Sequence, residues 1–192
     1  MAQVEIAAGK RRRNCFVALI KDRKGATAVE FAIIAAPFLA VIAALVQTFL
    51  LFLAQAQLES AVRASARQIM TGQVQSQDAG LTQAADQAAF RQTVCNKAAI
   101  LFTCSGLMVD VQVAPQWSSA NAAMPTLTYD AGGHVTNNWQ FNPGNAGDIV
   151  VVRVMYLWPS FFGTIAFSTA NQPNGDRLIM ASAAFQNEPA TP

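Results

Sequence analysis

Residues 25–36 decide the fold of this chain, and they read Gly25-Ala26-Thr27-Ala28-Val29-Glu30-Phe31-Ala32-Ile33-Ile34-Ala35-Ala36. An uncharged stretch of 28 residues, 31–58, begins inside this segment. A helix rises about 1.5 Å per residue and needs roughly 20 residues to cross the hydrocarbon of a bilayer. The stretch therefore predicts a transmembrane helix. A secretory signal peptide would be shorter and would end in a small-residue cleavage site, whereas here the pattern continues into more helix.

Glu30 lies at the start of this apolar stretch. A carboxylate costs on the order of 3 kcal/mol or more at the centre of a bilayer, so its presence there requires a reason. A desolvated carboxylate is stabilised by a partner that supplies a cation. The sequence therefore makes Glu30 a candidate residue for pairing with another subunit.

The basic residues predict the orientation of the helix in the membrane. Residues 1–25 contain seven basic and two acidic residues, net +5, whereas residues 26–192 contain six basic and nine acidic residues, net −3. An excess of Lys and Arg marks the cytoplasmic side, so we expect a cytoplasmic N-terminus and an exported C-terminal part. The basic cluster at residues 10–13 is also compatible with a nucleic-acid patch, but the adjacent membrane span explains it better.

Downstream of the span the sequence predicts a small α+β domain. The long helix, residues 26–72, continues past the membrane with Leu58, Val62, Ala66 and Ile69 on one face and ends at Gly72, followed by a linker at 73–79. A second helix is expected at 82–95, with Leu81, Ala85, Ala88 or Ala89, Phe90 and Val94 on its apolar side. Alternating or β-branched runs predict strands at 107–113, 149–158 and 178–185.

The expected architecture is thus a long N-terminal helix that carries a small domain with an antiparallel sheet of about three strands. Residues 116–148 are rich in Gly, Asn, Pro and Ala and predict a long exposed loop or a loose hairpin. The corresponding regions are residues 1–25, residues 26–72 and residues 73–192, and the last region is large enough for one core.

Cys95 and Cys104 lie nine residues apart in the part expected to be exported. On that side of the membrane two such cysteines can form a disulfide, although the sequence leaves open two free buried thiols. Cys15 lies in residues 1–25, on the reducing side. A metal site would require more thiols or histidines, and the chain has a single histidine, His134.

No sequence motif supports an enzyme or a bound cofactor. The chain contains no G-x-S-x-G, no H-E-x-x-H, no P-loop and no Gly-rich dinucleotide turn. His134 follows two glycines and is interpreted as a loop residue, and Asp110 and Asp148 are expected to face solvent or to terminate strands. Each of the three tryptophans, Trp117, Trp139 and Trp158, is most simply explained by packing, although Trp139 in the loop is also suited to contact a partner.

The segment from Gly25 to Ala32, with basic residues before it and Pro37 within the span, resembles a type IV prepilin and, more closely, the opening motif of the TadE-like family. Residues 61–73, the cysteine pair leading into 107–111 and the ending at 185–189 are also similar to that family. The resemblance implies a minor pseudopilin of the tight-adherence (Tad/Flp) pilus in the bacterial inner membrane, with its C-terminal domain in the periplasm.

The same resemblance implies a processing site and a set of partners. A prepilin peptidase would cut between Gly25 and Ala26, and Glu30, then the fifth residue, would pair with the N-terminal amine of another subunit. The implied partners are the peptidase, other Tad pilins and pseudopilins, the inner-membrane assembly platform and membrane lipid, with no nucleic acid. The alternatives are an uncleaved single-span envelope protein whose exported domain binds another partner, and an anchored enzyme.

Overall fold

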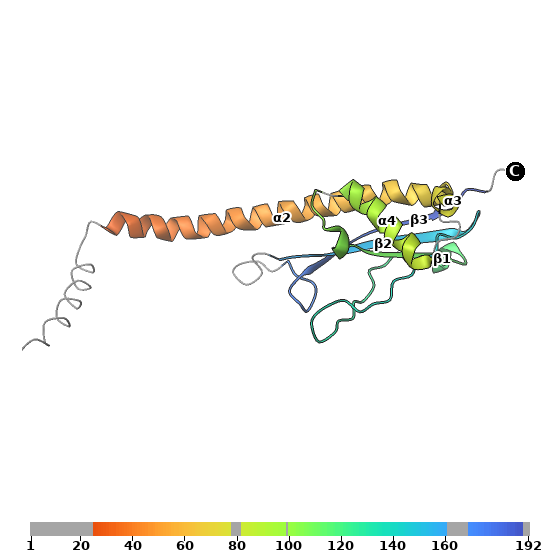
Figure 1. Cartoon of the computed structure of the whole chain (residues 1–192). Coiled ribbons are helices and arrows are strands. Elements are labelled where there is room, and N and C mark those ends of the chain that lie inside the picture. The colour runs from red at the N-terminus through yellow and green to blue at the C-terminus, as the bar shows by residue number, and fades with distance from the viewer. Residues whose placement is uncertain (1–24, 78–81, 99, 161–168, 190–192) are drawn as a thin grey trace, which may run out of the picture. The chain divides into compact units, whose positions relative to one another are not determined.

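The computed structural model describes residues 25–77, 82–98, 100–160 and 169–189, and Figure 1 shows its elements. The resemblance implies that residues 1–25 form a cytoplasmic prepilin-type leader. Residues 1–24 of it, with the basic cluster at 10–13 and Cys15, lie outside the described residues, as do the end of the expected linker and Leu81. The chain divides into two compact units, residues 1–45 and residues 46–192. The described part of the first unit is helix, and the second unit contains the sheet.

Helix α2, Ala26–Met70, is 45 residues long and continues through Pro37. Its first half exposes large apolar side chains. Its second half buries one face, on which Leu58, Val62, Ala66 and Ile69 are each at most 4 % exposed. Burial on that face confirms the helical periodicity that the sequence predicts past the membrane span.

The end of α2 depends on Gly72, whose φ of +73° lies in the left-handed region that favours glycine. The Gly72 N–H donates to the Ile69 carbonyl at 3.0 Å. The expected linker then differs from the structure, because residues Gln73–Gln77 form the short helix α3. The reason is that Gln75 folds back and its amide donates to the Ile69 carbonyl at 3.2 Å, which anchors the turn.

Helix α4, Gln83–Ala98, corresponds to the predicted second helix and extends three residues beyond its expected end. Thr82, the expected first residue of this helix, directly precedes it, with its hydroxyl 3.4 Å from the backbone nitrogen of Ala85. Phe90 and Val94 are buried as predicted, but Ala88 and Ala89 are exposed. Alanine fits either face of a helix, so its position in the sequence does not fix the boundary of the buried face.

The three predicted strands form one antiparallel sheet in the order β1-β2-β3. Strand β1 comprises Met108–Ala114, strand β2 comprises Ile149–Trp158 and strand β3 comprises Arg177–Gln186. The α+β fold class expected from the sequence is therefore correct. In the second unit, the sheet presents one face to α4 and to the C-terminal half of α2, where a continuous apolar core includes Val94, Val111, Val152 and Ile179 (Figure 1).

The expectation of a long exposed loop or a loose hairpin at 116–148 is largely confirmed, because most of its residues are exposed and Tyr129 pairs with Val135 in an isolated antiparallel bridge. The segment packs against the other face of the sheet, where Leu127 joins Met155 and Leu178 in a second apolar cluster with Trp139 packed against it. It also pairs with β1, because the Val111 N–H donates to the Gln140 carbonyl at 2.8 Å. Its Gly, Asn and Pro content reflects turns between these contacts, such as the bridge Tyr129↔Val135.

The expectation that Asp110 faces solvent is wrong, because Asp110 is only 1 % exposed. It lies directly opposite Arg153 in the β1–β2 register. The Arg153 guanidinium donates to the Asp110 carboxylate, with Nε 3.0 Å from Oδ2, and the Gln140 N–H donates to Oδ1 at 3.0 Å. The carboxylate is buried because the loop covers it and the opposite strand neutralises it.

Candidate functional site

The candidate site lies at the amino-terminal end of α2, in the first unit. Gly25 is exposed, and the helix begins at the next residue, Ala26. Among the described residues, nothing lies within 4 Å of where a Cβ on Gly25 would be, and the φ of Gly25 is not among the positive ones. Neither packing nor backbone conformation therefore explains why this residue is a glycine.

Glu30 is exposed and lies one helical turn after Ala26, so the two residues share a face of α2. It lies beyond the first turn of the helix, which contains no acidic residue, and the positive end of the helix dipole acts mainly within that first turn. In the described ranges no recorded ion pair includes Glu30. Once apolar surroundings replace water, this carboxylate needs a cation from elsewhere.

The first half of α2 exposes large apolar side chains, and as far as Leu45 it does so on all sides. Phe31, Ile34 and Phe52 are 73 %, 71 % and 70 % exposed, and the other large exposed side chains of this part of α2 are Val29, Ile33, Phe38, Leu39, Val41, Ile42, Leu45, Val46, Phe49 and Leu53. Contiguous apolar surface of this extent marks contact with lipid or with another protein. Among the described residues, α2 is the one helix long and apolar enough to cross a membrane. This finding is compatible with a single-pass anchor.

In the second unit, Cys95 and Cys104 are joined by a disulfide, with their Cα atoms 5.3 Å apart. Cys95, at the end of α4, is fully buried in the core. Cys104 lies in the 3-10 turn Cys104–Gly106, immediately before β1. The disulfide therefore links the end of α4 to the start of the sheet. It closes a short loop, and the lost entropy of the unfolded chain stabilises the fold by about 2–3 kcal/mol.

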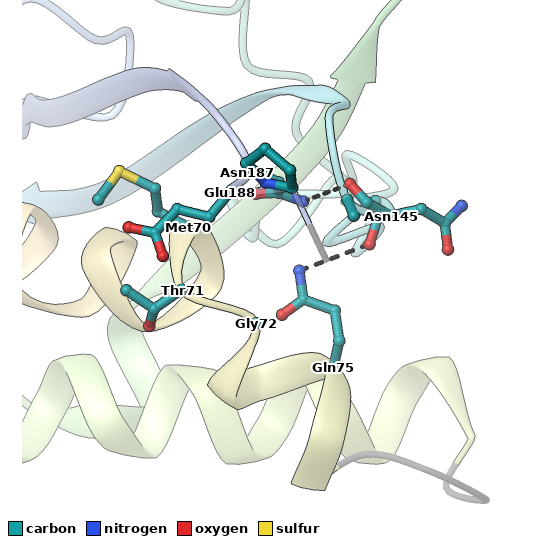
Figure 2. A pocket seen from close by; sticks show the side chains of 10 residues that line it. Met70, Thr71, Gly72, Gln75, Asn145, Asn187 and Glu188 are labelled. Atoms are coloured by element: carbon teal, nitrogen blue, oxygen red, sulfur yellow. Dashed lines mark hydrogen bonds between the residues drawn. The ribbon is translucent and has the colours of Figure 1, made fainter. Parts of the chain in front are cut away.

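A pocket of about 320 Å³ lies in the second unit where α2 and α3 meet the loop before β2 and the segment after β3 (Figure 2). Amide side chains hold this junction together: Asn187 Nδ2 donates to the Pro143 and Asn145 carbonyls at 2.9 and 3.0 Å. Glu188 is the sole titratable side chain among the residues that line it. The pocket offers no pair of groups for acid–base chemistry, and its contacts are those of a structural junction.

Among the described residues, the other titratable side chains considered for a catalytic or metal site do not lie together in one place. His134 is exposed, and the Asp130 carboxylate accepts hydrogen bonds from the backbone N–H groups of His134 and Gly132 at 2.9 and 2.8 Å. The bond from His134 is the main cause of a lowered pKa at Asp130. The pair is a surface turn. Across the described ranges, no three His, Cys, Asp or Glu side chains are grouped so that they could hold a metal ion.

The structure thus places the predicted residues in two groups. Gly25, Ala26 and Glu30 lie together at the start of α2, in the first unit, while Cys95 and Cys104 lie in the second unit. The sequence analysis missed Asp110 and Arg153 as a buried pair. The signal for that pair was present: each is the lone charged residue of its strand, and the two have opposite signs.

Comparison with known proteins adds one match. A family model described as TadE-like protein matches residues 25–67, which include Gly25, Ala26, Glu30 and most of α2. No curated protein and no solved structure matches the chain. The match confirms the resemblance predicted from the opening motif: residues 25–67 match the TadE-like family.

Proposed function

We propose that this chain is a membrane-anchored minor pseudopilin that takes part in assembly of a Tad/Flp type IV pilus, used for tight adherence to surfaces. Residues 1–25 form a cytoplasmic leader, α2 spans the inner membrane, and the second unit lies in the periplasm. A prepilin peptidase removes the leader between Gly25 and Ala26. The other partners are Tad pilins and pseudopilins and the inner-membrane assembly platform.

The observation that carries this proposal is the combination of features on α2 within the match to the TadE-like family. The first half of this helix pairs an exposed apolar surface with a single carboxylate, Glu30, and an unpacked glycine lies immediately before its first residue. A simple anchor requires the apolar surface but neither the carboxylate nor the glycine.

The physical chemistry of that surface suits a subunit that leaves the bilayer. Lipid tails are about as apolar as leucine side chains, so moving this helix from lipid into a bundle of similar helices changes its hydrophobic free energy little. The free energy that favours the helix bundle over the lipid must then come from specific contacts between subunits. A salt bridge between Glu30 and the new α-amine of a neighbouring subunit is such a contact, and it forms only after the leader is removed.

A chimera experiment tests the proposal. We expect deletion of the chain in its native host to reduce surface pili, counted by electron microscopy, to near background, and the intact chain to restore them. A matched chimera keeps the whole second unit, residues 46–192, but carries an unrelated single-pass helix in place of residues 1–45. If α2 is an assembly element, the chimera reaches the membrane and leaves the cells without pili. Pili in the chimera strain, or in the deletion strain, would contradict the proposal, and the former result would favour an anchored envelope protein.

A further inference from the structure

Strand β3 has an open edge in the second unit. In the sheet order β1-β2-β3 it pairs with β2 on one side and is the last strand on the other. Alternate residues of an antiparallel strand direct their backbone groups toward and away from the partner. Just after β3, Asn187 faces the loop that leads into β2, because its N–H donates to the Asp148 carbonyl at 2.9 Å. Ser182, Ala184 and Gln186 therefore direct theirs outward.

Helix α2 closes the two ends of this edge and leaves its middle open. The Gln55 amide donates to the outward carbonyl of Met180 at 2.9 Å, and the N–H of Glu188 donates to the Met70 carbonyl at 2.9 Å. Between these contacts, no hydrogen bond among the described residues reaches the outward backbone groups of Ser182 or Ala184. The side chains of both residues are exposed. The open segment is thus about five residues, 182–186.

This edge lacks the protection that exposed edges usually have. Natural edge strands carry a lysine, a proline, a bulge or an inward charge, which prevents pairing with other chains. Residues 178–186 contain no charged residue and no proline, and the exposed positions are small or neutral. An unprotected edge of this kind is either an aggregation risk or a binding site.

A groove beside the edge indicates what would bind there. It measures about 340 Å³ and lies between α2 and β3, with Ala66, Met70 and Phe185 among the apolar residues that line it. Arg63 and Arg67, both exposed, form its basic side. Arg63 contacts Glu59 at 3.4 Å, but its side chain is 76 % exposed, and such a surface pair constrains the guanidinium weakly. The groove therefore suits apolar side chains accompanied by carboxylates.

We infer that the outer edge of β3 at residues 182–186, with this groove, is a docking site for an extended acidic segment of a different protein. The segment adds a fourth strand through backbone hydrogen bonds, places small apolar side chains in the groove and directs carboxylates to Arg63 and Arg67. A second copy fits less well, because edge-to-edge pairing would bring two sets of these arginines together. The outer edge of β1 is already bonded to residues 140–142. The inference does not depend on pilus assembly by α2.

Peptide binding to the purified full-length chain in detergent micelles tests this inference. The probe is a labelled peptide of alternating valine and glutamate, read by fluorescence anisotropy. We expect saturable binding that weakens at least about tenfold when lysine replaces glutamate, or when N-methyl groups block the backbone N–H groups on one edge of the peptide. Equal binding of the acidic and basic peptides, or no saturable binding of the acidic one, would overturn the inference.

Substitutions in the chain locate the site. Ala184→Pro removes an outward N–H that has no partner within the sheet, so it should weaken binding about fivefold to tenfold without lowering the unfolding temperature. The matched control Ala122→Pro makes the same substitution at an exposed loop position outside the site and should bind the peptide normally. A second test reverses the charge of the groove, and it locates the site even if Ala184→Pro fails to fold. The double variant Arg63→Glu with Arg67→Glu should bind the basic peptide more tightly than the acidic one.

Unchanged peptide preference in this charge-reversed variant would contradict the proposed site. If the unmodified chain forms dimers and Ala184→Pro abolishes them, the edge would instead be the binding site for a second copy of the chain, which would overturn the inference.

Discussion

Glu30→Gln is expected to abolish or sharply reduce piliation while leaving cleavage after Gly25 intact. The two side chains have nearly the same size and both are polar, so the substitution removes charge and little else. In a contact of low dielectric it leaves the α-amine of the neighbouring subunit unpaired, which costs about 3–5 kcal/mol. A loss of that size corresponds to a reduction of about 100-fold or more in the affinity of one subunit for the next.

The readouts for this substitution are pili counted by electron microscopy and co-purification of other pilus components with the chain. The matched control is Glu59→Gln on the same helix, because Glu59 makes an exposed pair with Arg63 at 3.4 Å and should tolerate the change. Normal piliation with Glu30→Gln would mean that the carboxylate is merely tolerated near the interface and that assembly depends on helix packing.

Asp110→Ala is expected to destabilise the second unit by about 3–5 kcal/mol, because it leaves the largely buried Arg153 guanidinium without its carboxylate. It also removes the acceptor for the Gln140 N–H, which holds the 116–148 segment on the sheet. A domain with a typical stability of about 5–15 kcal/mol would lose a large part of it.

Urea unfolding of the full-length chain in micelles, followed by tryptophan fluorescence, measures this loss. The matched control is Glu59→Ala, which removes the carboxylate of an exposed acid–arginine pair and should cost less than about 1 kcal/mol. The double variant Asp110→Leu with Arg153→Met should recover part of the loss, since no buried charge remains unpaired. A cost for Asp110→Ala no larger than that of the control would show that this pair does not organise the domain.

The elements that the sequence predicted are those whose signals are local. The apolar run of α2, the left-handed position at Gly72 and the β-branched run of β2 each lie within a single segment, and β2 has the predicted bounds of 149–158. Hydrophobic periodicity and turn chemistry act over a few residues, so they can be interpreted without knowing the rest of the fold.

The missed features depend on contacts between distant segments. Burial of Asp110 requires that it face Arg153 across the β1–β2 register and that residue 140 lie over it, and no single segment specifies either condition. The groove along β3 likewise arises from the contacts of Gln55 and Met70 in α2 with Met180 and Glu188. Register and packing are properties of the assembled sheet. The composition of residues 116–148 correctly indicated turns and exposure, but it did not indicate that Leu127 and Phe141 would be buried.

The start of the candidate site was predictable because it consists of consecutive residues, 25–30. What the structure adds is that nothing packs on Gly25 and that Glu30 lies beyond the first turn of α2. These observations remove two ordinary explanations for the glycine and the carboxylate, which are a packing requirement and stabilisation by the helix dipole.

N-terminal sequencing of the chain, isolated from membranes of its native host, tests the central claim most directly. A pseudopilin exposes the bond between Gly25 and Ala26 to a prepilin peptidase and enters assembly with a new α-amine on Ala26. We expect the sequence to begin at Ala26, and the same chain from a strain that lacks the peptidase to keep its leader. A chain from the native host that begins at Met1 or Ala2 would contradict the account.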